Sequence, residues 1–240
     1  MIKGRSVLAV VPARGGSKGI PLKNLHPIRG RPLVAIVGDV IKSVTEIDRA
    51  LVSTDHPEIA RVAREAGLVD LFRRPAHLSG DTVGDLEVLT HALQEAEQHD
   101  GRHYDVIVML QPTSPLRKPE HVSEAIRRLV DGGWDSVWTV SMTDPKAHPL
   151  KQLTINESGE LGYYDERGRA IIARQQLTPV YHRNGVAYAI TRDCLMQQRS
   201  INGRRCGAYL LKGEHISIDT LADIDLLEWW LDREPAEASH

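Results

Sequence analysis

The sequence predicts an α/β fold in which a mostly parallel sheet is flanked by helices, and three observations predict it. Short continuous apolar runs recur along the chain, as in strands that are buried on both faces. Segments of helical periodicity lie between these runs, and this alternation favours parallel strands joined by right-handed crossovers. The first run ends in Pro12 and a glycine-rich turn. In such sheets, ligands collect beyond the carboxyl ends of the strands, where this turn lies.

The predicted strands are runs rich in β-branched or other apolar residues. The first, 6–11, reads Ser-Val-Leu-Ala-Val-Val and leads into the glycine-rich turn. The other runs are 50–53, 106–110, 136–140 and 185–191. Together they account for the predicted sheet.

The clearest predicted helix spans 119–130. Pro119 suits the first turn of a helix, and apolar residues then recur at the spacings of one helical face. These residues are Val122, Ala125, Ile126, Leu129 and Val130. We expect this apolar stripe to cover the sheet.

Two further helices are predicted from apolar spacing and capping residues. One spans 86–96 and is preceded by Thr82, with Asp85 three residues on, which resembles a capping box. The other spans 222–231 and has Thr220 as its N-cap.

A segment rich in turn-forming residues interrupts this alternation. The pieces 152–155 and 160–164 have the character of short strands between prolines and glycines. We therefore predict a β-rich insertion over 143–183, and an α/β domain made of 1–142 and 184–240.

The composition narrows the class of protein. The chain has 30 Lys and Arg against 32 Asp and Glu, a formal charge of -2, which argues against a nucleic-acid-binding footprint. With 41% hydrophobic and 26% charged residues, it has the composition of a globular domain. No apolar run approaches the roughly 18 residues that a membrane helix needs, and no signal peptide is recognisable. We expect a cytoplasmic protein that does not bind membranes.

Cysteine and histidine give no motif with recognisable chemistry. Cys194 and Cys206 lack CxxC spacing, so we expect reduced structural thiols and no structural zinc. The 11 histidines show no metal-ligand spacing. Without a nucleophilic Ser or Cys motif, we expect no covalent intermediate.

The most informative segment is the loop 11–24, Val-Pro-Ala-Arg-Gly-Gly-Ser-Lys-Gly-Ile-Pro-Leu-Lys-Asn. Its glycines let backbone N–H groups close on a polyanion, and its arginine and two lysines neutralise the charge. The spacing fits neither the P-loop nor the G-x-G-x-x-G dinucleotide motif. Two interpretations follow from the residues: a phosphate-binding cradle, or a solvated basic turn.

Several motifs, taken in order, resemble those of the CMP-sialic acid synthetases, the acylneuraminate cytidylyltransferases. The stretch 12–24 resembles the signature of that family. The other matching motifs are 52–55, Arg74 and Pro75 with Leu78 and Asp81, 110–117, 148–151, 174–176, 184–185 with Tyr188, and 218–220. The resemblance implies a Rossmann-like nucleotidyltransferase sheet and cytidylyltransferase activity.

The resemblance implies a CTP site. Its residues would be Arg14, Gly15, Gly16, Ser17, Lys23, Asn24, Arg74 and Asp85. Lys23 would face the charge that develops on the transferred phosphorus. Arg74 would bind the cytosine edge, with a surface arginine as the alternative. Asp85 stands where the family has a hydroxyl group, and it would either accept from the cytosine amino group or cap its helix.

The resemblance also implies Mg²⁺, with Asp219 as its ligand. The family usually has Asp-x-Asp at this point, but here Ser217 replaces the first carboxylate. Asp223 does not restore the pair, because it is expected to cap the last helix. Magnesium commonly binds through one or two carboxylates plus substrate phosphates, so Asp219 alone still permits catalysis. A purely structural Asp219 is the alternative.

The acceptor site is implied by a second set of residues. Gln111, Lys151, Arg174 and Tyr188 fall where the family binds its acceptor sugar acid. A nonulosonic acid carries a carboxylate beside its reacting hydroxyl, so a cationic pocket is required. His182 and Arg183 depart from the family pattern, which leaves the identity of the acceptor open.

The resulting hypothesis is a cytidylyltransferase that transfers CMP from CTP to sialic acid or a related nonulosonic acid. Arg14, Lys23 and Asp219 would be the catalytic residues, and Mg²⁺ the cofactor. CTP and a small acidic sugar are the expected partners, and the resemblance implies a homodimer formed through 143–183. Three alternatives stay open: a phosphonate or other acidic acceptor, a sugar-nucleotide glycosyltransferase, and a non-catalytic nucleotide sensor.

Overall fold

The computed structural model describes residues 1–233, which form two compact units. The larger unit contains residues 1–139 and the described residues from 184 onward. The smaller unit contains residues 140–183. No helix among residues 1–233 is both long and apolar enough to span a membrane.

A six-stranded sheet forms the centre of the larger unit, in the order β10-β6-β9-β5-β1-β4. β1 pairs in parallel with both β4 and β5, whereas β9 runs antiparallel to β5. The strands are β1 (Val7–Pro12), β4 (Arg49–Ser53), β5 (Val106–Met109), β6 (Ser136–Met142), β9 (Tyr181–Thr191) and β10 (Cys206–Leu210). The predicted fold class, a mostly parallel sheet flanked by helices, is confirmed.

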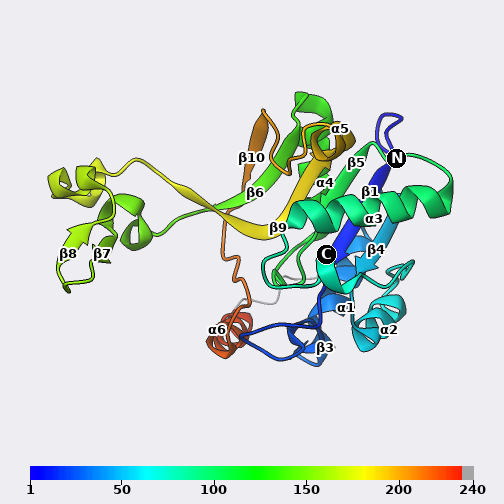
Figure 1. Cartoon of the computed structure of the whole chain (residues 1–240), viewed down its shortest axis with the longest axis horizontal. Helices are drawn as coiled ribbons and strands as arrows, with labels where there is room; N and C mark the ends of the chain where they lie inside the picture. Colours follow the sequence, from blue (N-terminus) through cyan, green and yellow to red (C-terminus); the bar gives the residue numbers. More distant parts are fainter. Residues whose placement is uncertain (234–240) are drawn as a thin grey trace. The chain divides into compact units, whose positions relative to one another are not determined.

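Helices cover both faces of the sheet, and alternate residues of β1 show how. Val7, Ala9 and Val11 pack in one core cluster with α1, α2 and α4. Leu8 and Val10 pack in the other with α3 and α5. Figure 1 shows α3 lying across one face. The helices are α1 (Leu33–Ile41), α2 (Pro57–Glu65), α3 (Asp85–Asp100), α4 (Pro119–Gly132), α5 (Arg192–Met196) and α6 (Leu221–Leu231).

The predicted start of α4 and the predicted cap of α6 are confirmed, and the predicted cap of α3 is wrong. α4 begins at Pro119. α6 is capped by Thr220, whose hydroxyl accepts from the backbone N–H of Asp223. The predicted cap of α3 is wrong, because Gly84 is the N-cap and Asp85 is already the first helical residue. A carboxylate in a first turn still interacts favourably with the helix dipole.

A third apolar cluster joins α6 to the loop that follows β1. Ile20 of the loop packs with Ile218, which precedes α6, and with Leu227 inside it. A two-stranded ladder of β2 (Pro27–Ile28) and β3 (Arg31–Pro32) closes the loop. Although far apart in sequence, the glycine-rich turn and the segment before α6 therefore lie together.

The smaller unit has less strand than the sequence predicts. β7 (Leu153–Ile155) and β8 (Leu161–Tyr163) form an antiparallel hairpin, near the predicted strand segments. Its turn is held by Asn156, whose side-chain oxygen accepts from the backbone N–H groups of Ser158 and Glu160. The rest of the unit is dominated by short 3-10 turns, at 145–147, 149–151, 166–170 and 174–176. The description "β-rich" is therefore corrected to one hairpin among 3-10 turns.

Candidate active site

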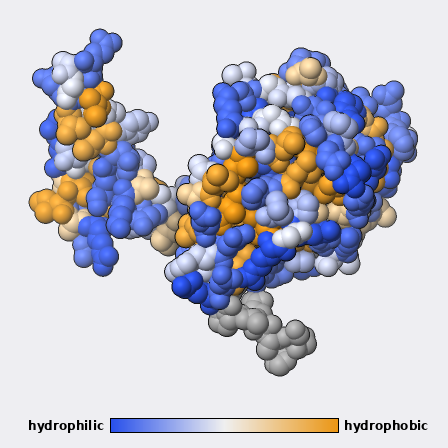
Figure 2. Space-filling view, turned by 90° about the horizontal axis from the view of Figure 1, so that it is seen from below, coloured by the Kyte–Doolittle hydropathy of each residue, from blue (hydrophilic) through white to orange (hydrophobic). Residues whose placement is uncertain are grey.

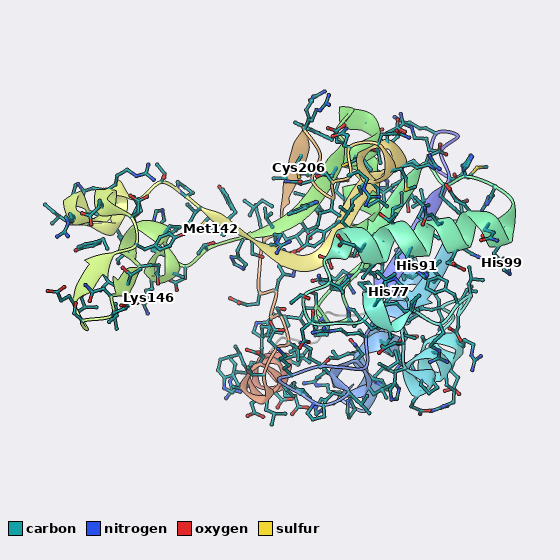
Figure 3. The ribbon with its side chains drawn as sticks, in the orientation of Figure 1. His77, His91, His99, Met142, Lys146 and Cys206 are labelled. Atoms are coloured by element: carbon teal, nitrogen blue, oxygen red, sulfur yellow. The ribbon has the colours of Figure 1, made fainter. Side chains whose placement is uncertain are left out.

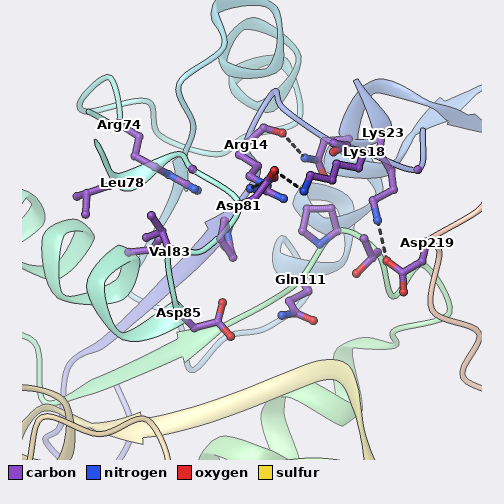
Figure 4. Close-up of a pocket in the computed structure, with 18 of the residues that line it drawn as sticks. Arg14, Lys18, Lys23, Arg74, Leu78, Asp81, Val83, Asp85, Gln111 and Asp219 are labelled. Atoms are coloured by element: carbon purple, nitrogen blue, oxygen red, sulfur yellow. Dashed lines mark hydrogen bonds and ion pairs between the residues drawn. The ribbon is translucent and has the colours of Figure 1, made fainter. Parts of the chain in front are cut away.

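A cavity of about 640 Å³ lies where β1 and β5 end, entirely within the larger unit. Figure 4 shows charged side chains entering it from several elements. The sequence-predicted residues that line it are Arg14, Ser17, Lys23, Asn24, Arg74, Asp85, Gln111 and Asp219. This position, beyond the carboxyl ends of parallel strands, is where such sheets bind ligands.

The glycine-rich loop is held by one hydrogen bond to the residue after β4 and by another across the loop itself. The backbone N–H of Gly15 donates to the carboxylate of Asp55, which follows β4, at 2.8 Å. The buried side chain of Asn24 donates to the carbonyl of Arg14 at 2.9 Å. A methyl group at Gly15 would lie 3.0 Å from the His56 side chain, so a side chain would push the loop away. These contacts hold the loop in a defined conformation, while the Lys18 side chain is 81% exposed, so the phosphate-binding cradle stays a prediction.

Lys23 links this loop to the segment that carries Asp219. Its ammonium group donates to the carbonyl of Ile218 and to the Asp219 carboxylate, each at 2.8 Å. The Lys23 side chain is 15% exposed, whereas that of Asp219 is 72% exposed. The Ile218 backbone N–H donates to the Thr113 carbonyl at 2.8 Å, which ties the segment to the loop after β5. Asp219 thus presents a carboxylate to the cavity on a well-anchored backbone.

Gly19 makes a second link between the loop and this segment. A methyl group at this position would lie far inside van der Waals contact of the carbonyl oxygen of Asp219. Backbone would have to move, because neither side of this contact is a flexible side chain.

Gly19→Ala is accordingly expected to destabilise the protein by about 1–3 kcal/mol. Its kcat/KM should fall by up to about 10²-fold, because the loop and Asp219 are pushed apart. Urea unfolding and steady-state kinetics measure the two effects. Gly162→Ala, whose methyl group would meet Thr154 at an ordinary 3.5 Å, is the control and should change neither. A fully active and stable Gly19→Ala protein would show that this contact is not needed.

Arg74 is a buried cation in the wall of the cavity. Only 4% of the residue is exposed, and its guanidinium donates to the hydroxyl and the carbonyl of Ser53. Burial lowers its pKa to about 10, against the opposing effect of Asp55 and Asp85, so it remains charged at neutral pH. The alternative of a surface arginine is therefore wrong.

Asp85 also enters the cavity, from the start of α3 (Figure 4). It does not serve as the helix cap, since Gly84 holds that position. Its charge favours the protonated form of Arg74. The cavity wall thus carries a hydrogen-bond donor, Arg74, and an acceptor, Asp85, which could both bind the polar edge of a ligand.

Lys18 and Asp81 line the cavity too. Lys18 is one of the two loop lysines expected to neutralise a polyanion, and Asp81 belongs to a matching motif, but neither was assigned to the CTP site. The two oxygens of Asp81 contact different cations: one lies 2.9 Å from Arg14, the other 2.8 Å from Lys18. The hydrogen bond from Lys18, with the nearby Arg14, keeps the pKa of Asp81 below its usual value. Asp81 is therefore ionised at neutral pH. The composition of the glycine-rich loop was the sequence signal for Lys18.

Arg117 is a further residue that the sequence did not single out. It is buried, and its guanidinium donates to the carbonyls of Val186, Gly185 and Gln111. Burial lowers its pKa. Arg117 fixes the backbone from which Gln111 reaches the cavity.

The remaining predicted residues lie outside the cavity lining. Gly15 and Gly16 belong to the loop but are not among the lining residues. Tyr188 is 2% exposed, and its hydroxyl accepts from the Gly185 backbone N–H at 2.8 Å. Lys151 and Arg174 belong to 3-10 turns of the smaller unit.

No cysteine or histidine of residues 1–233 is among the residues that line this cavity. Cys206 is exposed on β10 (Figure 3). Cys194 is buried, and both cysteines are free thiols. Among residues 1–233, no group of three or more His, Cys, Asp and Glu side chains is placed to hold a metal ion.

Comparison with known proteins adds a second kind of evidence. A family model described as "Cytidylyltransferase" matches residues 8–221. The chain is 32% identical over 225 residues to N-acylneuraminate cytidylyltransferase A of Danio rerio, with 93% of this chain and 50% of that protein covered. It is 34% identical over 227 residues to the CMP-N,N'-diacetyllegionaminic acid synthase of Legionella pneumophila, covering 92% and 94%. The chain thus spans half the length of the first relative and nearly all of the second.

A solved structure shares the fold. The structure of CMP:2-keto-3-deoxy-manno-octonic acid synthetase with CTP matches with a TM-score of 0.71 at 18% identity. The match covers 96% of this chain and 100% of that one. At this identity the likeness is evidence for the fold alone.

Proposed function

This chain belongs to the cytidylyltransferase family, among the CMP-sialic acid synthetases, and on that premise we propose that it transfers CMP from CTP to a nonulosonic acid and releases pyrophosphate. One observation carries the proposal. The cavity holds Arg14, Lys18 and Lys23 on the glycine-rich loop, and the buried Arg74 on the wall across from Lys23 (Figure 4). Such a cavity suits a triphosphate with a polar base edge.

The proposed reaction is an in-line displacement at the α-phosphorus of CTP. The acceptor hydroxyl oxygen bonds to that phosphorus as the bond to the pyrophosphate oxygen breaks, and the hydroxyl proton passes to water. Such transfers depend mainly on positioning and on stabilising phosphate charge. Lys23 would offset charge on the transferred group, and Arg14 the charge on the leaving pyrophosphate. Arg74 and Asp85 would bind the cytosine edge.

Mg²⁺ is the proposed cofactor, with Asp219 as its protein ligand. Asp219 suits this role because its carboxylate is 72% exposed and Lys23 contacts one of its two oxygens, Oδ1. Magnesium keeps waters and binds substrate phosphates alongside one or two carboxylates. When bound, it would supply additional positive charge to the triphosphate.

For the acceptor, we propose contacts from Gln111, Lys151 and Arg174. Gln111 lines the cavity and is held by Arg117. Lys151 and Arg174 would provide the positive charge that a sugar carboxylate requires. Both belong to residues 140–183, the unit that we propose to form the dimer. Because the substrate is a nucleotide, we also propose a cytoplasmic location.

The proposed dimer contact is the apolar surface of the smaller unit. Figure 2 shows hydrophobic residues gathered on that unit. Ile155 and Leu161 face each other across the hairpin and are 71% and 68% exposed. Exposed apolar side chains that cluster in this way are typical of protein interfaces.

Replacing both Ile155 and Leu161 by serine is therefore expected to turn a dimer into a monomer in light scattering at micromolar concentration. Folding should be kept within about 0.5 kcal/mol, since both side chains are exposed. A wild-type protein that is monomeric at all concentrations, or a double variant that dimerises equally well, would contradict the proposal.

Pyrophosphate release tests the proposed function. The protein is incubated with Mg²⁺, each of the four nucleoside triphosphates, and a panel of nonulosonic acids and phosphonates. We expect release that depends on CTP and on a nonulosonic acid. Release with phosphonates only would favour the alternative acceptor class. No acceptor-dependent release with CTP would reject cytidylyl transfer, and would leave glycosyl transfer or nucleotide sensing.

A further inference from the structure

Each cation of the glycine-rich loop is paired with a carboxylate in this structure. Lys23 pairs with Asp219, while Arg14 and Lys18 share Asp81. The groups that would bind a triphosphate are therefore already engaged. A ligand gains their full charge only when these contacts rearrange.

Asp81 is placed like one end of a phosphate group. One of its oxygens contacts a guanidinium N–H and the other an ammonium group, at 2.9 and 2.8 Å. Phosphate oxygens make the same charge-assisted hydrogen bonds to arginine and lysine. A carboxylate and a phosphate group cannot occupy this position together, because both are negative and accept from the same donors.

The two carboxylates differ in how firmly they are held. Asp219 sits on a backbone fixed by Thr113 and by its close approach to Gly19. Asp81 lies in the turn between the Ala76–Leu78 3-10 helix and α3, and its side chain is 43% exposed. A rotation about its own side-chain bonds would withdraw it into solvent.

From this difference we propose that Asp81 is an intramolecular competitor for the phosphates of the substrate. In the free protein Asp81 pairs with Arg14 and Lys18. These ion pairs break when the triphosphate binds to the two cations, and they form again as pyrophosphate leaves. Asp81 is thus a positioning residue that weakens phosphate binding and shortens the stay of the product. The inference rests on the proposed function for its nucleotide, but not for the identity of the acceptor.

Direct binding of inorganic pyrophosphate tests this role. Titration calorimetry is done without divalent metal, at neutral pH and low salt, on the wild-type protein and on Asp81→Asn. We expect Asp81→Asn to bind pyrophosphate about three- to tenfold more tightly, the range expected for losing two partly exposed ion pairs. Cytidine, which has no phosphate, should bind both proteins within twofold. In the steady state, product inhibition by pyrophosphate should strengthen by the same factor.

Two variants serve as controls. Asp81→Glu keeps the charge and should stay near the wild-type affinity. Asp131→Asn removes a carboxylate that pairs with exposed Lys3, outside the residues that line the cavity, and should leave pyrophosphate binding unchanged.

Several results would overturn the proposal. They are an unchanged or weaker affinity of Asp81→Asn for pyrophosphate, an equal gain for cytidine, and no binding of pyrophosphate to either protein. A loss of turnover without any gain in affinity would instead make Asp81 a direct contributor to the reaction. The proposed function can fail while this inference stands. If Asp81→Asn binds pyrophosphate more tightly but the protein shows no acceptor-dependent pyrophosphate release from CTP, Asp81 competes for phosphate and the proposed cytidylyl transfer is wrong.

Discussion

Lys23→Ala is expected to lower kcat/KM for CTP by about 10²- to 10³-fold, the loss typical of removing one preorganised group that stabilises transition-state charge. The Lys23 side chain is 15% exposed and reaches the cavity from the loop. The substitution should change the free energy of unfolding only slightly. Losing the hydrogen bond to the Ile218 carbonyl costs about 1 kcal/mol, which lowers Tm by about 2–4 °C in a protein of this size.

Steady-state kinetics and thermal unfolding on the same preparation separate the two effects. Lys3→Ala is the matched control, because Lys3 pairs with Asp131 at an exposed position outside the cavity lining. It should retain wild-type activity. A collapse of stability in Lys23→Ala that parallels the loss of turnover would make Lys23 a structural lysine that holds the segment before α6.

Asp219→Asn is expected to lower kcat by about 10²-fold or more, and to raise the Mg²⁺ concentration needed for half-maximal rate. A bound metal supplies several kcal/mol of charge stabilisation in the transition state, and here Ser217 offers no second carboxylate to hold it once the charge of Asp219 is lost. The amide keeps the shape of the side chain and a carbonyl oxygen for Lys23. Its fold should therefore be preserved.

Asp225→Asn, on the exposed face of α6, is the matched control and should behave as wild type. Rates are measured over a Mg²⁺ titration at saturating CTP. A normal rate with an unchanged Mg²⁺ requirement in Asp219→Asn would leave Asp219 as a structural partner of Lys23, and the metal would need another site.

Local signals predicted much of the larger unit. The apolar run at β1, the proline at the start of α4 and the Thr220 cap of α6 are each encoded within a few residues. α1 was not predicted, because its short sequence, Leu-Val-Ala-Ile-Val-Gly-Asp-Val-Ile, is almost wholly apolar, and such a run does not distinguish a buried strand from a helix. α5 is only 5 residues long.

The site was predicted only as far as single motifs allow. The glycine-rich loop could be recognised from its composition. The contact of Gly19 with Asp219 could not, because it accompanies the packing of Ile20 against α6, which lies far away in the sequence. The same holds for Asp81, whose pairing with Lys18 joins distant parts of the chain. The role of Asp85 was ambiguous in the sequence, because helix boundaries cannot be predicted to better than a residue or two. The helix begins at Asp85 with Gly84 as its cap, so the Asp85 side chain is not the cap and enters the cavity.

The central claim is that the loop after β1 binds the triphosphate of CTP. A crystal structure of the protein with CTP and Mg²⁺, without acceptor, tests it most directly. We predict phosphate density against Arg14 and Lys23, cytosine beside Arg74, and Asp81 turned away from the loop cations. CTP bound elsewhere, or an empty cavity in which Asp81 still pairs with Arg14 and Lys18 at saturating nucleotide, would contradict the account.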